Sequence, residues 1–176
     1  KSNVIFKKLN FKKIEYLFYL GDYSLVLSEL ENQIKLYDLS DKELNDLLEL
    51  KTILISFNQD KIKFKNFANI QYKINTNKIF ESYSNLIELI DSENILISEL
   101  TQFQYCLIEV KKGNFIDVKK IIQSMKDVTI FTELSKIIEV EIEDFIFNNY
   151  LDSINLYENF LINYPNSIYK ENIIKR

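Results

Sequence analysis

Apolar residues return every three or four positions along this chain, with polar and charged residues between them. The pattern is clearest around three turns, at Gly21, Gly113 and Asn148, which we align as equivalent anchors. Most of the equivalent positions hold large residues: Phe11, Phe103 and Ile138 ten residues before the anchors, and Phe18, Val110 and Phe145 three before. After the anchors come Tyr23, Phe115 and Tyr150 at two residues, Val26, Val118 and Ser153 at five, and Leu30, Ile122 and Tyr157 at nine. This spacing is what two antiparallel helices need to bury a common seam. Gly or Asn supplies the left-handed residue that such a turn often requires.

The same periodicity predicts helices over most of the chain. They span residues 4–20, 22–37, 41–57, 61–73, 77–91, 93–112, 115–126, 130–147 and 150–163, with a terminal helix from Asn166 or Ser167. Ser40 and Glu43 form a capping box for the third of them. One proline and two glycines leave few helix breakers. We therefore predict an all-α chain of at least eight, and about nine to ten, helices with no sheet.

Several large residues are expected to face the core. They are Phe6, Phe11, Ile14 and Phe18; Leu44, Leu47, Leu48, Leu54 and Ile55; Phe64, Phe67 and Ala68; Phe80, Tyr83, Ile87 and Ile90; Leu96, Leu100, Phe103, Leu107 and Val110. The helix over 93–112 is apolar nearly all round, which is typical of a central helix. Phe103 is accordingly expected to be buried.

Three stretches resemble the second helix of a tetratricopeptide repeat: GDYSLVLSELENQI, GNFIDVKKIIQSM and NNYLDSINLYENFLINYP. They share an aromatic two residues past the turn and a smaller residue at the helix crossing, and the last ends at Pro165. YENFLINYPNS is similar to repeats of bacterial cell-envelope proteins. The resemblance implies antiparallel helix pairs stacked as a short right-handed α-solenoid. The chain departs from the family in its scarcity of alanine, and in apolar stripes that lie one residue closer to each turn.

On this interpretation residues 1–176 form a single helical domain. Residues 1–74 hold two helix pairs, 75–92 an extra helix outside the repeat, 93–165 two further pairs, and 166–176 a terminal capping helix. The phase of the repeat between residues 58 and 92 stays open.

The residue types present limit which catalytic, metal and phosphate-binding sites the chain can form. The chain has no histidine and a single cysteine, Cys106, which excludes His-based catalysis and the usual structural zinc sites. Two distant glycines cannot form a phosphate-binding loop. The carboxylates between Asp38 and Asp46 are interpreted as a helix start, and Glu139 with Glu143 as a solvated face rather than an acid–base pair. We expect no catalysis, cofactor or metal.

Charge and hydropathy leave one stretch of the chain as a candidate for binding nucleic acid. The net charge of −4 gives no global attraction to nucleic acid or anionic membranes, and no apolar run is long enough to span a bilayer. Residues 61–78 carry five lysines and no acid, interleaved with Phe64, Phe67 and Tyr72. Such a strip can bind single-stranded nucleic acid. The spacing of the aromatics favours a core face instead.

The preferred hypothesis is a non-enzymatic scaffold that binds a segment of another protein in a concave groove lined by the first helices of successive pairs. The expected partner-binding residues are Lys12, Tyr16, Tyr19, Asp46, Glu49, Ile53, Gln104, Ile108, Lys111, Lys136, Glu139 and Glu143. The alternative is a self-assembly module that packs a second copy on the helix at 77–91. The resemblance implies a periplasmic or membrane-associated protein, with any targeting segment missing from this chain, which begins at Lys1; a cytoplasmic location is the alternative.

Overall fold

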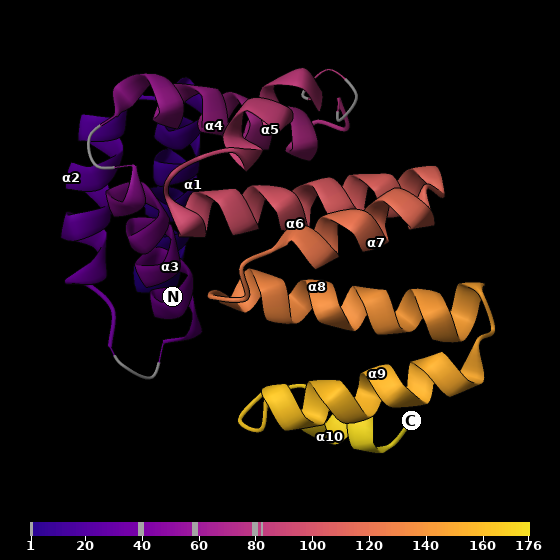
Figure 1. Cartoon of the computed structure of the whole chain (residues 1–176). Helices are drawn as coiled ribbons and strands as arrows, with labels where there is room; N and C mark the ends of the chain where they lie inside the picture. The colour runs from indigo at the N-terminus through magenta and orange to yellow at the C-terminus, as the bar shows by residue number, and fades with distance from the viewer. Residues whose placement is uncertain (1, 39–40, 58–59, 79–80, 82) are drawn as a thin grey trace. The chain divides into compact units, whose positions relative to one another are not determined.

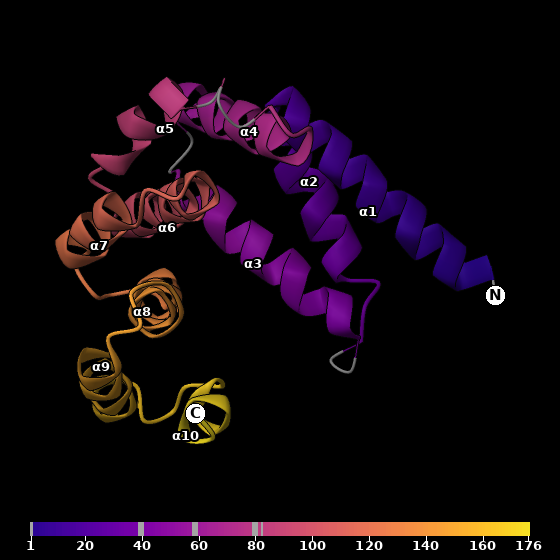
Figure 2. The same cartoon turned by 90° about the vertical axis from the view of Figure 1, so that its right-hand side faces the viewer.

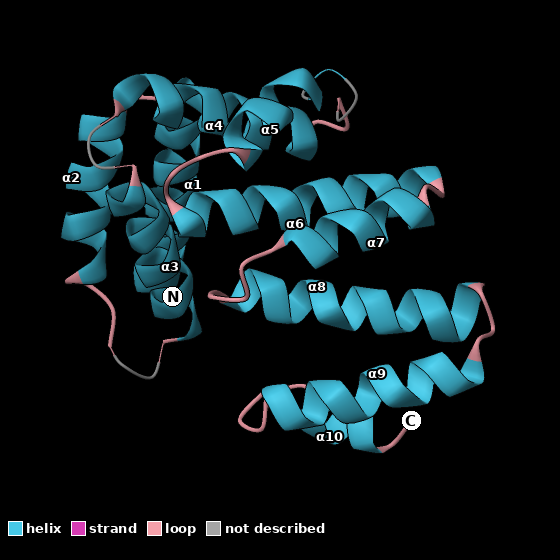
Figure 3. Cartoon of the chain, viewed as in Figure 1, coloured by secondary structure: helices cyan, strands magenta, loops and turns pink. Residues whose placement is uncertain are grey.

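A computed structural model of the chain describes residues 2–38, 41–57, 60–78, 81 and 83–176. These residues form ten α-helices and one π-helical turn, and no strand occurs among them (Figures 1 and 3). The prediction of an all-α fold is confirmed.

The helices follow the predicted order. They are α1 (Ser2–Leu20), α2 (Tyr23–Ile34), α3 (Lys42–Ser56), α4 (Lys61–Asn75), α5 (Tyr83–Ile90), α6 (Ile95–Lys112), α7 (Phe115–Ser124), α8 (Ile130–Glu141), the π-helical turn η2 (Ile142–Ile146), α9 (Tyr150–Asn163) and α10 (Lys170–Ile174). Two helices, α5 and α10, begin at least three residues later than predicted. Left-handed Asn77 (φ 58°) separates α4 from α5, and the terminal helix starts at Lys170 rather than at 166 or 167. Ser40 of the expected capping box lies outside the described residues, and the N-cap of α3 is Asp41.

The three anchor turns adopt the backbone that the alignment predicts. Gly21 has φ 73°, Gly113 has φ 80° and Asn148 has φ 53°, all in the left-handed region. This conformation costs Gly little and Asn less than most residues. The equivalence extends five residues past each turn, where Val26, Val118 and Ser153 are all buried.

Contacts divide the chain into two compact units, residues 1–98 and 99–176, where the sequence indicated one continuous domain. The division falls inside α6, between Ser98 and Glu99.

Unit 1 is built around an aromatic cluster. Phe64 of α4 is fully buried, and its ring lies 5.6 Å from that of Phe18, 5.5 Å from that of Tyr23 and 5.7 Å from that of Phe57. These contacts place α4 against α1, while α2 packs on both α1 and α3. Edge-to-face ring pairs of this kind add about 0.5–1.5 kcal/mol each beyond area burial. Burial of Phe64 and Phe67 confirms that these two aromatics face the core, whereas Tyr72 is exposed.

The helix expected to be unpartnered, α5, packs against α4. It buries Leu86 and Leu89, whereas Ile87 on its outer side is exposed. Self-assembly through this helix stays a prediction, with Ile87 as the large apolar residue left on its outer face. Phe80 lies outside the described residues.

Unit 2 packs its helices in chain order. Cys106 of α6, Val118 and Ile122 of α7, and Ile142 of η2 form a buried cluster. α7 then packs on α8, α8 on α9 and α9 on α10, and Figure 2 shows α8 and α9 nearly end-on. Successive antiparallel contacts are what a stacked repeat requires, although a right-handed solenoid of the whole chain stays a prediction.

Several residues that the periodicity assigned to the core are exposed instead. They are Phe6, Leu48, Ile55, Ile87 and Leu107. In α3 the buried stripe consists of Leu44, Leu47 and Leu54, so Leu48 and Ile55, each one position further on, fall at its solvent edge. Phe103 is half-buried rather than buried, and its ring lies 5.9 Å from that of Phe131.

Candidate functional site

A cleft of about 360 Å³ opens between α1 and α3 in unit 1. Lys7, Lys8, Phe11 and Lys12 of α1 line one side, and Tyr37, Asp41, Glu43 and Asp46 line the other. The cleft therefore combines aromatic surface with cations on one wall and carboxylates on the facing wall.

The local sequence explains this arrangement. On α1, Lys8, Phe11 and Lys12 stand at spacings of three and four residues, so they share one face of the helix. On α3, Glu43 and Asp46 are likewise one turn apart, near the helix start. Carboxylates are favourable at this position because the first turn carries the positive end of the helix dipole.

An ion pair holds the loop before α3 against α1. The Lys7 Nζ lies 2.7 Å from the Asp41 Oδ2, and the same oxygen accepts a hydrogen bond from the Asp38 N–H at 2.9 Å. The Lys7 ammonium also lies 4.5 Å from the centre of the Tyr37 ring. The hydrogen bond to Asp41 raises the pKa of Lys7 and lowers the pKa of Asp41. One end of the cleft is thus held by a charged contact, while Lys8 and Asp46 remain exposed.

Two of the residues predicted to bind a partner in this unit, Lys12 and Asp46, line the cleft. Lys12 also pairs with Glu15, with 2.5 Å between the Lys12 Nζ and the Glu15 Oε2. The other four lie outside the cleft. Tyr16 and Glu49 are exposed and Ile53 is half-buried. The half-buried Tyr19 contacts the Asn75 amide, and its ring packs on that of Tyr72.

Half of the six predicted partner-binding residues of unit 2 are buried. The expectation of a solvated face is wrong for Glu139 and Glu143, which are buried, and Ile108, expected in the groove, is buried as well. Gln104 is half-buried and Lys111 is exposed. Glu139 accepts a hydrogen bond from Lys136 at 3.1 Å, and Glu143 pairs with Lys119. A buried carboxylate needs such a partner because an unpaired buried charge is costly. Glu143 thus links η2 to α7, whereas the Lys136–Glu139 pair lies within α8.

A second, smaller cleft of about 220 Å³ lies between α8 and α9. The Lys136–Glu139 pair lines it together with Asp127, Asn159, Asn163 and Tyr164. Tyr164 donates its hydroxyl to Asp127, and burial together with this bond raises its pKa. The cleft brings together two of the predicted residues, Lys136 and Glu139, in a polar setting.

Sequence reasoning missed the most buried carboxylates of unit 2, Glu99 and Glu109. Glu109 accepts hydrogen bonds from Lys112 at 2.7 Å and from the Asn114 amide at 2.5 Å. Lys112 and Asn114 lie three and five residues further along the chain, a proximity visible in the sequence. The partners of Glu99 are backbone groups 29 and 30 residues away, and no local pattern reveals them.

Cys106 lies in the core of unit 2. Burial raises the pKa of its thiol to about 12, and the charge of Glu139 adds to the rise. A thiol so held is protonated at neutral pH and is a poor nucleophile. In the described part of the chain, no group of three His, Cys, Asp or Glu residues is placed to hold a metal ion. Among the same residues, no helix combines the length and apolar character that crossing a membrane requires.

Comparison with known proteins returned no family model, no curated protein and no solved structure that matches this chain. The resemblance to tetratricopeptide repeats therefore rests on the residues quoted above.

Proposed function

We propose that the chain is a non-enzymatic interaction scaffold that binds a segment of a partner protein in the cleft between α1 and α3. The main observation in support is that Phe11 and Tyr37 lie in one cleft between a wall of three lysines and a wall of three carboxylates. Apolar surface with a few placed charges is the usual composition of a binding site for a peptide or small ligand.

The size and charge of the cleft support a short segment rather than a broad interface. A volume of about 360 Å³ accommodates one or two apolar side chains, and aromatic anchors of this kind carry much of the energy of an interface. The lysines and carboxylates act mainly on orientation and association rate, since exposed charges contribute little net affinity. The partner segment then carries an apolar anchor flanked by an acid and a base.

The resemblance to envelope repeats adds the expected setting. Proteins with stacked helix pairs present extended surfaces to peptide segments. We therefore propose a partner in the bacterial cell envelope, bound without turnover of any substrate.

The test is affinity capture from source-cell lysate, followed by titration of the captured partner. Lys12→Glu and Asp46→Lys each reverse one charge of a wall, so that it repels the group of the partner that this wall attracts, and each should weaken binding by about fivefold to thirtyfold. Most of the loss should lie in the association rate and should diminish at high salt. Lys61→Glu is the matched control, because Lys61 is an exposed lysine on α4 that does not line the cleft.

Binding that survives both cleft variants unchanged would place the partner elsewhere. Equal loss in Lys61→Glu would show that general charge, not the cleft, governs the interaction.

A further inference from the structure

One end of unit 2 carries a group of large apolar side chains on its surface. Phe145, Ile146, Phe147, Tyr150 and Leu151 surround the turn between η2 and α9, and they are between 45% and 77% exposed. The seven residues from 145 to 151, FIFNNYL, include no charged residue. We call these five side chains the apolar tip. Exposed apolar groups of this density mark surfaces that meet a partner or a membrane.

The π-helical turn accounts for the exposure of Phe145. The Phe147 N–H donates to the Ile142 carbonyl at 3.1 Å, five residues back rather than four. This inserts one extra residue and turns the following side chains by about 100° around the helix axis. Phe145 stands three residues before the left-handed Asn148, just as Phe18 stands three before Gly21. Phe18 is buried and Phe145 is 58% exposed.

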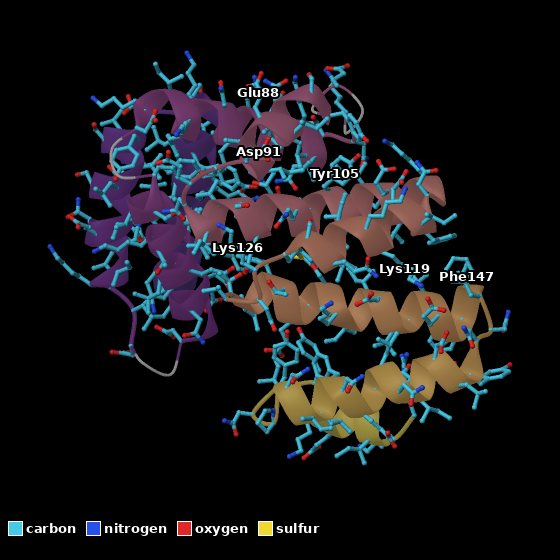
Figure 4. The ribbon with its side chains drawn as sticks, viewed as in Figure 1. Glu88, Asp91, Tyr105, Lys119, Lys126 and Phe147 are labelled. Atoms are coloured by element: carbon cyan, nitrogen blue, oxygen red, sulfur yellow. The ribbon has the colours of Figure 1, made fainter. Side chains whose placement is uncertain are left out.

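A second turn lies beside the tip. The Phe115 ring of α7 contacts the Phe147 ring at 6.3 Å, and the Lys119 ammonium lies 5.8 Å from the centre of the Phe147 ring. Figure 4 shows Lys119 and Phe147 at this same end of unit 2. Exposed Ile116 adds apolar surface on this side. This turn and the start of α7 also carry Lys111, Lys112 and Lys120; Lys112 pairs with Glu109 at 2.7 Å, and Lys120 pairs with the exposed Asp117 at 3.0 Å.

We propose that the apolar tip inserts into the interface of a lipid bilayer, with the lysines of the neighbouring turn among the phosphate groups. Three observations favour lipid over a protein partner. The tip is the projecting end of two helices (Figure 1), and a bilayer needs no complementary pocket to receive it. Its apex is uncharged and rich in aromatic side chains, as in interfacial segments. Its flank carries the exposed lysines Lys111, Lys112 and Lys120, cations of the kind that lipid phosphate binds.

The acids on this end of unit 2 limit the electrostatic contribution. Glu143 is buried against Lys119, and Asp152 contacts the Asn149 amide. Glu141 lies 3.2 Å from Arg176. The attraction to lipid therefore comes mainly from apolar insertion, and anionic lipid strengthens it only a few-fold. This inference is independent of the cleft between α1 and α3.

The experiment is co-sedimentation of the full chain with phosphatidylcholine vesicles, and with vesicles containing about one-third phosphatidylglycerol. Leu151→Ser removes an apolar side chain from the tip and should weaken binding to both vesicles about tenfold. Ile162→Ser is the matched control. It makes a comparable exchange on the same helix, at a residue 72% exposed against 77% for Leu151. The two positions are 11 residues, or about 16 Å, apart along α9.

Insertion of the tip is supported if Ile162→Ser binds the vesicles within about twofold of the parent chain while Leu151→Ser loses binding. Lys120→Glu should then reduce only the additional binding to the anionic vesicles. The proposal is overturned if the parent chain fails to sediment with either vesicle, or if both serine variants lose binding equally. It is also overturned if light scattering shows a dimer that Leu151→Ser dissociates while no vesicle binds. A circular dichroism melt for each variant confirms that the fold is retained.

Discussion

Glu99 offers a sharp test of the interior of unit 2. Its carboxylate is 1% exposed and accepts hydrogen bonds from two backbone N–H groups, that of Val128 at 3.2 Å and that of Thr129 at 2.8 Å. Thr129 is the N-cap of α8, and its hydroxyl accepts from the Phe131 N–H at 3.2 Å. A side chain of α6 thus extends the cap of α8 with a negative charge. We expect Glu99→Gln, which keeps the shape and removes the charge, to destabilise unit 2.

The magnitude follows from the contacts. A hydrogen bond to a charged group contributes about 1.5–3 kcal/mol, and a charge at a helix N-terminus about 0.3–1 kcal/mol. Glutamine keeps one acceptor oxygen but turns an N–H₂ group toward the remaining backbone N–H. The net cost at neutral pH should therefore be about 2–3 kcal/mol in the free energy of unfolding.

The cost should depend on pH with a defined sign. Burial alone would raise the pKa of Glu99, but the hydrogen bonds that its carboxylate accepts at the start of α8 outweigh burial and lower the pKa below its ordinary 4.5. A folded-state pKa below the unfolded value means that the carboxylate stabilises the fold fully above the unfolded pKa. This stability is lost as the pH falls through the folded value. The difference between the parent chain and Glu99→Gln should thus be complete at neutral pH and shrink in acid, below 4.5.

The assay is urea denaturation of the full chain at neutral and acidic pH, with amide hydrogen exchange in α8 as the local reporter. Exchange is needed because two compact units need not unfold together. Glu158→Gln is the control, since Glu158 is an exposed acid on α9. A Glu99→Gln effect below about 0.5 kcal/mol at neutral pH would show that the carboxylate does not support α8. A constant difference at every pH would show that the charge is not the cause.

Three other predictions concern packing and backbone. Phe64→Ala should cost about 3–5 kcal/mol, measured by denaturant midpoint, because it empties the centre of the aromatic cluster; a change near zero would refute the assignment of the core. Phe103→Ala should cost less, about 1–3 kcal/mol, because that ring is only half-buried, and a larger loss would mean that it is more enclosed than its exposure indicates. Gly21→Ala should lower the melting temperature more than Gly113→Ala. Both glycines have positive φ, but a Cβ at Gly21 would lie 2.8 Å from the Lys65 Cγ, whereas a Cβ at Gly113 would have no neighbouring atom within 4 Å. Equal shifts in melting temperature would contradict this reasoning.

The positions of the helices and their turns could be predicted from the sequence because local interactions decide them. A helix needs an apolar stripe at a period near 3.6 residues, and a tight turn needs a residue that tolerates positive φ. Gly21, Gly113 and Asn148 supply that residue, and all three adopt the left-handed conformation. The cleft was partly visible too, since Lys12 and Asp46 were predicted and both line it.

Only the tertiary structure decided which edge of each stripe is buried, because burial depends on where neighbouring helices lie. Leu107 is exposed although Cys106 and Ile108 on either side of it are buried. The π-helical turn likewise shifted the register before Asn148 and moved Phe145 to the surface. Burial of Glu99 depends on hydrogen bonds to residues 29 and 30 positions away. Periodicity specifies one apolar face per helix and says nothing of buried charges. A buried carboxylate such as Glu99 is tolerated only where backbone N–H donors converge on it, and only the folded chain brings these distant donors to the carboxylate.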